Sequence, residues 1–233
     1  MWWQTTLDSR AVYENNVVTL CPNYRCMGNQ VILVSRKQSA FARHSVLLGL
    51  TVSETRGAAP GEASWEAVQW EMSSMYDFVQ RNSIISRLLK SPADCTRILD
   101  FNIAEADITD ERIVNEALTY CDLLRIGSQQ LPALCHFLGI ATRSVFDSCF
   151  DLMAKFDIKT LILSHGNLGC HVFHGYAVSE KWGRLAFGNC TTEEAEGAFT
   201  AAYYAASRGE KKVFTDYHRQ ALAYLERICN AGG

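Results

Sequence analysis

The sequence predicts an α/β fold with three layers and a largely parallel central sheet. From about residue 80 onward, short apolar segments alternate with segments of helical periodicity, and the connections between them are short. One apolar segment, KTLILSH (159–165), is nearly free of polar residues, which is typical of a strand buried on both faces of a parallel sheet. We therefore expect helices to cover both faces of this sheet.

Composition limits the classes of protein to consider. The chain has 233 residues, 48% of them hydrophobic and 20% charged, which fits one domain with a sizeable core. The formal net charge of −3 argues against a nucleic-acid binder or a partner of anionic membranes. The sequence contains no run of 18 apolar residues and does not begin with a signal-peptide pattern, so we expect a cytoplasmic protein.

The first part of the chain has weaker signals. Residues 30–36 and 44–53 are rich in β-branched and aliphatic residues and are predicted as strands. Glycine and proline in residues 54–64 predict a loop. The next segment, 65–79, is predicted as a helix with one apolar face: Trp65, Val68, Trp70 or Met72, and Met75.

The remaining elements follow a regular order. Thr109 is predicted to cap a helix, and Gly139 is predicted to end one. The predicted helices span 83–91, 109–121, 128–139, 142–156, 191–208 and 212–229, and the predicted strands span 97–103, 122–126, 159–165 and 170–179.

In sheets of this kind, ligands bind at the carboxyl ends of the strands. A site is therefore expected after Phe101, after Ile126 and after Ser164, and just before Thr191. Segments at and around these places carry a resemblance. GEASWEAVQW, VQRNSIISRLL, RILDFNI, CDLLRIGSQQL, LILSHGNLGCHVF, GAFTAAYYAASRG and HRQALAYLERICNAGG resemble, in order and spacing, the ribokinase-like (PfkB-type) carbohydrate kinases, and most closely their fructokinase branch.

The resemblance covers about three quarters of the chain and divides it in two. Residues 61–233 are expected to form a ribokinase-like α/β domain. Residues 1–60 are expected to be a divergent N-terminal segment with predicted strands, so the fold should be incomplete on its N-terminal side. This segment is a candidate to cover a sheet edge or to contact a partner protein or a second copy of the chain.

Two motifs of the family are altered here. The family has Asp-x-Asn-x-Arg after one strand, and the matching residues are Asp100, Asn102 and Ala104. The resemblance implies that Asp100 and Asn102 bind substrate, while the guanidinium that would bind phosphate oxygens is missing from this motif. The family's Asn-x-x-Glu, associated with magnesium, is Gly127 and Gln130 here, and a neutral amide does not compensate the charge of Mg²⁺.

A third motif, Thr-x-Gly-x-x-Gly, approaches the nucleotide in the family. Its matches are Ser164, Gly166 and Gly169. Glycines allow the backbone to come close to a ligand, but a simple turn between strands would use the same glycines. Nucleotide binding and a plain turn are both consistent with this segment.

The fourth motif is the family's Gly-Ala-Gly-Asp helix start, where backbone amides bind anions and the Asp is the general base. The matching residues are Glu194, Ala195, Glu196 and Gly197. Carboxylates at an anion site should repel phosphate, at about 4 kcal/mol per contact of ~4 Å for an effective dielectric of ~20. The same segment is a good helix start, since Thr191 and Glu194 have the spacing of a capping box.

These substitutions predict a sugar-kinase-like protein that is catalytically inactive or impaired, a pseudoenzyme acting by binding or assembly, with weak nucleotide binding through Ser164–Gly169. The alternative is an active ATP-dependent, fructose-type kinase that requires ATP and Mg²⁺ and uses Glu196 in place of Gly197 as base. A structural subunit without a ligand is a third interpretation.

Other reactive residues are weaker candidates. Cys21 and Cys26 lack a second Cys/His pair at zinc spacing, and Cys190 beside the Thr191 cap is interpreted as a packed thiol. His171 and His174 should point to opposite faces of their strand, which disfavours a joint metal site.

Overall fold

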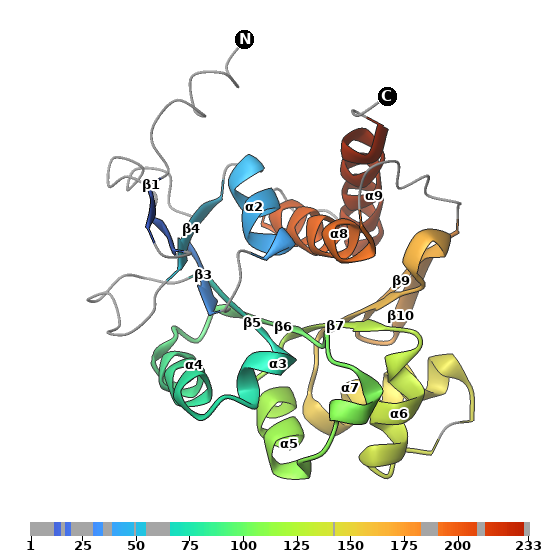
Figure 1. The fold of residues 1–233 in the computed structure, drawn as a ribbon. Coiled ribbons are helices and arrows are strands. Elements are labelled where there is room, and N and C mark those ends of the chain that lie inside the picture. Colours follow the sequence, from blue (N-terminus) through green and yellow to red (C-terminus); the bar gives the residue numbers. More distant parts are fainter. Residues whose placement is uncertain are drawn as a thin grey trace.

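The structure, a computed structural model, describes residues 12–14, 17–19, 30–34, 39–48, 50–54, 66–141, 143–182, 191–208 and 213–230. A single sheet of ten strands runs through the molecule in the order β1-β2-β4-β3-β5-β6-β7-β8-β9-β10 (Figure 1). Its strands are β1 Val12–Glu14, β2 Val17–Thr19, β3 Gln30–Val34, β4 Thr51–Glu54, β5 Ala67–Glu71, β6 Thr96–Asp100, β7 Leu123–Gly127, β8 Thr160–Ser164, β9 Gly169–His174 and β10 Ala177–Trp182.

The centre of the sheet is parallel, as the sequence predicts. Strands β4, β3, β5, β6, β7 and β8 pair with parallel neighbours. Strands β1 and β2 on one side and β9 and β10 on the other are antiparallel. Every residue of β8 is buried, which confirms the prediction from its apolar sequence.

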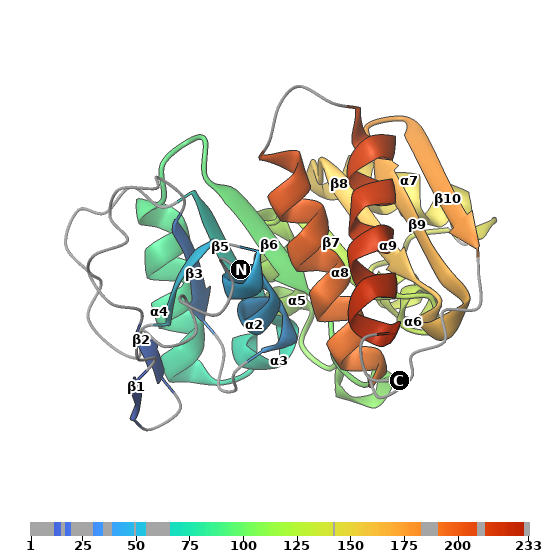
Figure 2. The ribbon, with the colours of Figure 1, turned by 90° about the horizontal axis from the view of Figure 1, so that it is seen from above.

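Helices cover both faces of the sheet, which gives three layers. Helices α2, α8 and α9 lie on one face, and α3 to α7 lie on the other (Figures 1 and 2). The helices are α2 Ala40–Leu47, α3 Met72–Met75, α4 Phe78–Lys90, α5 Glu111–Thr119, α6 Gln130–Phe137, α7 Val145–Phe156, α8 Thr192–Ser207 and α9 Phe214–Asn230, with short 3₁₀ turns at Glu105–Asp107 and Gly166–Leu168.

The two helical layers enclose two separate cores. Successive residues of a strand face opposite sides, so Leu99 and Leu124 belong to the core under α3 to α7. Their neighbours Ile98 and Leu123, together with Ile162, belong to the core under α2, α8 and α9. This alternation decides which strand residues can meet helix α8.

The segment 44–53, predicted as a strand, is a helix followed by a strand. Helix α2 includes residues 44–47, and β4 begins at Thr51. The helix starts earlier than predicted, because the Ser39 hydroxyl caps it by accepting a hydrogen bond from the Ala42 N–H. The apolar residues of the first part of this segment therefore belong to a helix that packs against α8. The strand prediction was correct only for residues 51–53.

The helix predicted over 65–79 is also wrong in its first half. Residues 67–70 form the buried part of β5, and each is 1% exposed or less. A strand buried on both faces lacks the alternation of polar and apolar residues that identifies a strand. Its apolar residues therefore also fit the pattern of one face of a helix. Helix α3 begins only at Met72, and α4 begins at Phe78.

Two smaller predictions change as well. The strand predicted over 170–179 is a hairpin, in which Gly175 adopts a φ of +57° between β9 and β10. The cap of α5 is Asp110 rather than Thr109, because the Asp110 carboxylate accepts the Arg112 N–H at 2.9 Å. The end of α6 is as predicted, with Gly139 at a φ of +66°.

Strands β3 and β4 from the first 60 residues join the same sheet as β5, and the domain boundary near residue 60 stays a prediction. Among the helices that the structure describes, none combines the length and apolar character needed to cross a bilayer. Several predictions concern residues outside the described ranges: the loop beyond Glu54, Trp65, Cys21, Cys26 and Cys190.

Candidate functional site

A cleft of about 560 Å³ opens where β6, β7 and β8 end and helix α8 begins. This is the edge of the sheet at which ligands bind in parallel α/β folds. Most of its lining is polar and uncharged. The described lining residues are Asn102, Arg125, Gly127, Ser128, Gln129, Gln130, Ser164, His165, Gly166, Thr192 and Glu196.

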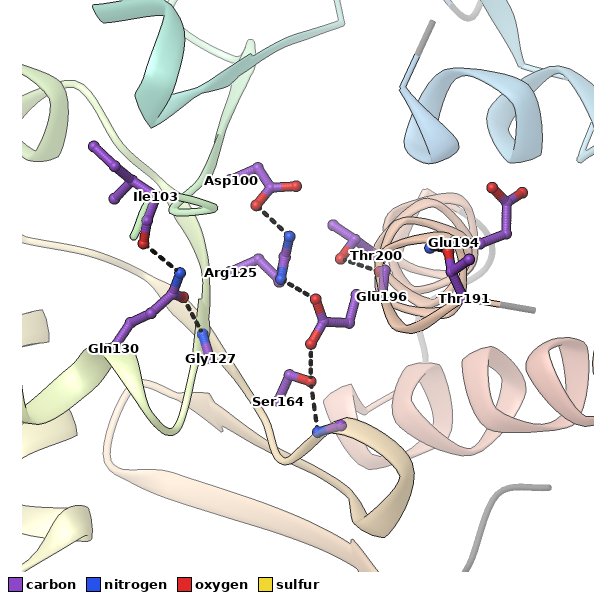
Figure 3. Close-up of polar contacts among 11 residues, drawn as sticks. Asp100, Ile103, Arg125, Gly127, Gln130, Ser164, Thr191, Glu194, Glu196 and Thr200 are labelled. Carbon is purple, nitrogen blue, oxygen red and sulfur yellow. Dashed lines mark hydrogen bonds and ion pairs between the residues drawn. The ribbon is translucent and has the colours of Figure 1, made fainter. Parts of the chain in front are cut away.

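Arg125 lies at the centre of this site. It is on β7 directly opposite Asp100 of β6, and strand alternation turns both side chains, with Ser164 of β8, to the face that α8 covers. The Arg125 side chain is 3% exposed and forms ion pairs with Asp100, at 2.5 Å, and with Glu196 (Figure 3). Burial alone would lower the pKa of Arg125, but the two carboxylates outweigh burial and raise it, so the guanidinium stays charged.

The carboxylate of Glu196 points from the first turns of α8 into the cleft. One oxygen pairs with Arg125, and the other accepts a hydrogen bond from the Ser164 hydroxyl (Figure 3). The Gly166 N–H donates in turn to the Ser164 hydroxyl at 3.2 Å. Glu196 is therefore held by two donors from two different strands.

Gln130 joins the ends of two neighbouring strands. Its Oε1 accepts the Gly127 N–H at 2.9 Å, and its Nε2 donates to the Ile103 carbonyl at 2.7 Å (Figure 3). Both polar atoms of this side chain are thus used by the backbone. The residues here do not fit Mg²⁺, because the Gln130 amide is engaged and the carboxylate among the described lining residues, Glu196, is bound by a guanidinium.

Gly197 follows Glu196 but lies against helix α2. A Cβ at this position would come within 2.5 Å of the Ala40 Cβ and 2.7 Å of the Phe41 nitrogen. Such contacts are far below van der Waals distance. The position that the resemblance assigns to the catalytic base therefore has no room for any side chain in this packing.

Glu194 faces away from the cleft. Its carboxylate pairs with Arg43 and contacts His44 Nε2 at 2.7 Å, and His44 Nδ1 contacts the Tyr224 hydroxyl at 2.9 Å. Burial would raise the pKa of Glu194, but the hydrogen bonds with His44 and Arg43 outweigh it and lower the pKa. The expected capping box is only half formed, since Thr191 accepts the Glu194 N–H at 3.1 Å while the carboxylate binds α2.

Of the three carboxylates at this helix start, Glu193, Glu194 and Glu196, only Glu196 is among the described residues that line the cleft. Glu193 is exposed to solvent, Glu194 pairs with α2, and Glu196 pairs with Arg125. Each of the two partly buried carboxylates has its own cation, because successive positions of a helix point in different directions.

The structure brings most of the predicted site residues together. Asp100 and Ser164 are linked through Arg125 and Glu196, and Asn102 and Gly166 line the same cleft. Gly169 lies instead at an adjacent, mainly apolar pocket, with a φ of +114° at the start of β9. Their roles toward a ligand stay predictions.

Arg125 is the residue that sequence reasoning missed. It lies on the neighbouring strand and pairs with Asp100 of the altered motif. The available signal was one arginine within the otherwise apolar run LLRI, since a charged residue is seldom buried without a partner.

His171 and His174 have different partners and do not form a joint site. His165 Nε2 contacts His171 Nδ1 at 2.8 Å, whereas His174 Nδ1 contacts the Thr160 hydroxyl at 2.9 Å. Within the described ranges, no three His, Cys, Asp or Glu side chains are arranged to hold a metal ion. Burial and the adjacent His171 lower the pKa of His165, so it is mainly neutral at pH 7.

No protein-family model matches the sequence, and no curated protein matches it significantly. Solved structures do match. A fructokinase double mutant from Vibrio cholerae O395, bound to fructose, ADP and potassium, has 15% identity and a TM-score of 0.56 over 73% of this chain and 55% of its own. Adenosine kinase from Anopheles gambiae, in complex with a di(adenosine) tetraphosphate, has 14% identity and a TM-score of 0.57 over 72% and 51%.

Aminoimidazole riboside kinase from Salmonella enterica is similar to the same extent, with 15% identity and a TM-score of 0.52 over 71% of this chain and 55% of its own. The chain thus spans little more than half the length of these kinases. At this level of identity the comparison shows the fold, which is that of the ribokinase-like carbohydrate kinases.

Proposed function

We propose that this ribokinase-like chain is a sugar-kinase-like protein with little or no phosphoryl-transfer activity, which keeps its cleft for binding a small molecule. Of the described residues that line the cleft, only Arg125 carries a lasting positive charge, and it already holds Asp100 and Glu196. Phosphoryl transfer depends on positive groups that stabilise a polyanion. Because Arg125 is already paired with two carboxylates, it has little positive charge left to stabilise a phosphate, and this observation carries the proposal.

Two further features support the loss of chemistry. The position of the family's base, Gly197, is closed by Ala40 and Phe41. The position of the family's magnesium-associated carboxylate is Gln130, which holds the strand ends. Two of the altered motifs thus have structural uses here.

The experiment is an assay of ATP-dependent phosphorylation over a panel of hexoses and pentoses, with Glu196→Ala as control. We expect wild type and variant to be equally inactive. Turnover by the wild type that disappears in Glu196→Ala would contradict the proposal, because it would make Glu196 a base.

One observation favours that second function, an active kinase with an altered base. Glu196 faces the cleft, beside Ser164 and Asn102, where a substrate hydroxyl would bind. Each of its oxygens already accepts one hydrogen bond, however, so a substrate hydroxyl would share the carboxylate with Arg125 and Ser164. The assay above separates the two functions.

Weak nucleotide binding through Ser164–Gly169 is a separate part of the proposal. A ligand that binds the folded state raises the unfolding midpoint by mass action. Thermal-shift titration with ATP, with and without Mg²⁺, should give a small rise at millimolar nucleotide. No rise would leave the turn a plain connection between β8 and β9.

A further inference from the structure

The charged cluster at the cleft does not balance. Arg125 and Glu196 line the cleft, and Asp100, which pairs with Arg125 but is not among the described lining residues, brings a second negative charge to the cluster. His165 adds none at pH 7, because burial and the neighbouring His171 lower its pKa. The remaining described lining is uncharged: Asn102, Gly127, Ser128, Gln129, Gln130, Ser164, Gly166 and Thr192.

The two carboxylates also keep spare hydrogen-bonding capacity. An ionised carboxylate accepts about four hydrogen bonds. The contacts described for Glu196 are one from Arg125 and one from Ser164, and the contact described for Asp100 is the ion pair with Arg125. The Glu196 side chain lines the cleft and is 16% exposed, so it is accessible to a ligand while largely removed from water. The Asp100 side chain is 17% exposed and lies outside the described lining.

We propose that the natural ligand of this cleft is a sugar that carries a protonated amine. The ammonium would pair with Glu196, to which Asp100 adds a second negative charge through the shared Arg125. The sugar hydroxyls would bond to the amides and hydroxyls of Asn102, Ser128, Gln129 and Thr192. This inference rests on the proposed function in one respect, that the cleft binds a small molecule. It adds the chemical class of that molecule.

Donor and acceptor counts favour this class over phosphorylated ligands. An ammonium is only a donor, and it brings the positive charge that the cluster lacks. A phosphate is an acceptor and adds negative charge to a cleft with an excess of it. The cleft volume of about 560 Å³ is within the usual range of ~300–1,000 Å³ for small-molecule sites.

The test is calorimetric binding of D-glucosamine to the wild type, beside D-glucose as its neutral counterpart and glucose 6-phosphate as its anionic one. We expect D-glucosamine to bind about tenfold more tightly than D-glucose, as a charged hydrogen bond in a sheltered site would give. Glucose 6-phosphate should bind least. The preference for the amine should fall as salt is raised.

Two variants identify the groups responsible. Glu196→Gln and Asp100→Asn keep the shape of the side chains and remove one charge each. The amine preference should shrink toward unity in Glu196→Gln, which loses the contacting charge, and by a smaller factor in Asp100→Asn. Glu193→Gln, the exposed carboxylate of the same helix turn, should leave it unchanged. Circular dichroism confirms that each variant is folded, and if one of the first two is not, the other still gives the result.

Equal binding of D-glucosamine and D-glucose would overturn the inference and leave the proposed function intact. The same holds if glucose 6-phosphate binds most tightly. Phosphorylation of any sugar in the activity assay would instead overturn the proposed inactivity. It would leave the inferred preference for an amine-bearing sugar untested by that assay and still decided by the binding comparison. Absence of binding by every sugar would overturn the inference.

Discussion

Glu194 and Glu196 are two residues apart on the same helix turn, and they have opposite surroundings. Glu194 faces α2 and joins three helices through Arg43, His44 and Tyr224. Glu196 faces the sheet and joins two strands through Arg125 and Ser164. The difference teaches that a run of carboxylates at a helix start is not one electrostatic feature, because the side of the helix decides each partner.

Gly197 explains why both contacts form. With no side chain there, α2 approaches α8 closely enough for Arg43 and His44 to reach Glu194. The same packing leaves Glu196 as the carboxylate that enters the cleft. The following variants test the two sides of this turn separately, beginning with the largest expected effect.

Removing the cation on the cleft side should be the most damaging change. Arg125→Met leaves Asp100 and Glu196 buried without a counter-charge, so we expect a loss of about 3–5 kcal/mol in the free energy of unfolding. Urea denaturation at pH 7 measures it. Arg112→Met, which removes a 93% exposed arginine, is the matched control and should cost less than about 1 kcal/mol.

The partner test is the double variant Arg125→Met/Glu196→Gln. Glu196→Gln removes one of the two carboxylate charges that Arg125→Met leaves without a cation, so it should restore part of the lost stability. The size of this recovery gives the coupling energy between Arg125 and Glu196 in a double-mutant cycle. Independent, additive effects would show that Arg125 and Glu196 do not interact as described.

Filling the space between α2 and α8 should have the next largest effect. Gly197→Ala would raise helix propensity, yet its Cβ would meet Ala40 and the Phe41 backbone, so we expect a net loss of about 1–3 kcal/mol. Thermal and urea denaturation measure it. The companion change Ala40→Gly should recover part of the loss, and a gain in stability from Gly197→Ala alone would show that the helices are not in close contact.

The smallest effect concerns the α2 side and depends on pH. Glu194→Gln should cost about 1 kcal/mol at pH 7, because its ion pair with Arg43 is lost and its hydrogen bond with His44 weakens. The pKa of Glu194 is lowered in the folded state, so its stabilisation is present above the ordinary carboxyl pKa of about 4.3 and is lost as the pH falls through the folded value.

The measurement for Glu194 is the difference in unfolding free energy between wild type and variant from pH 7 to pH 3. This difference in unfolding free energy should be constant near pH 7 and disappear toward pH 3. A difference that persists at low pH would assign the effect to packing rather than to the charge. Glu193→Gln, on the exposed face, should show no such profile.

The central and C-terminal elements of the fold could be predicted because their signals are local. Strand β8 is apolar throughout, and helix α7 has its cap and its apolar face within 15 residues of sequence. Residues 67–71 were misassigned because burial on both faces removes the periodicity that distinguishes a strand from a helix. Residues 44–47 were misassigned because the decisive cap, Ser39, lay outside the apolar run.

The site was predictable in place but not in its connections. The strand ends fixed where Asp100, Ser164 and Glu196 would meet, as the carboxyl edge of the sheet requires. The Arg125–Glu196 pair spans 71 residues, and no local pattern states which side of α8 faces the cleft. That choice depends on how α2 packs at Gly197, which is a property of the assembled fold.

The most direct measurement of the central claim is calorimetric binding of ATP to the wild type and to Glu196→Ala. If Glu196 occupies Arg125 in place of a phosphate ligand, removing its carboxylate frees one side of the guanidinium. We therefore predict weak binding by the wild type and binding about tenfold tighter by the variant. Tight binding by the wild type that Glu196→Ala weakens would contradict the account, because Glu196 would then be part of a working nucleotide site.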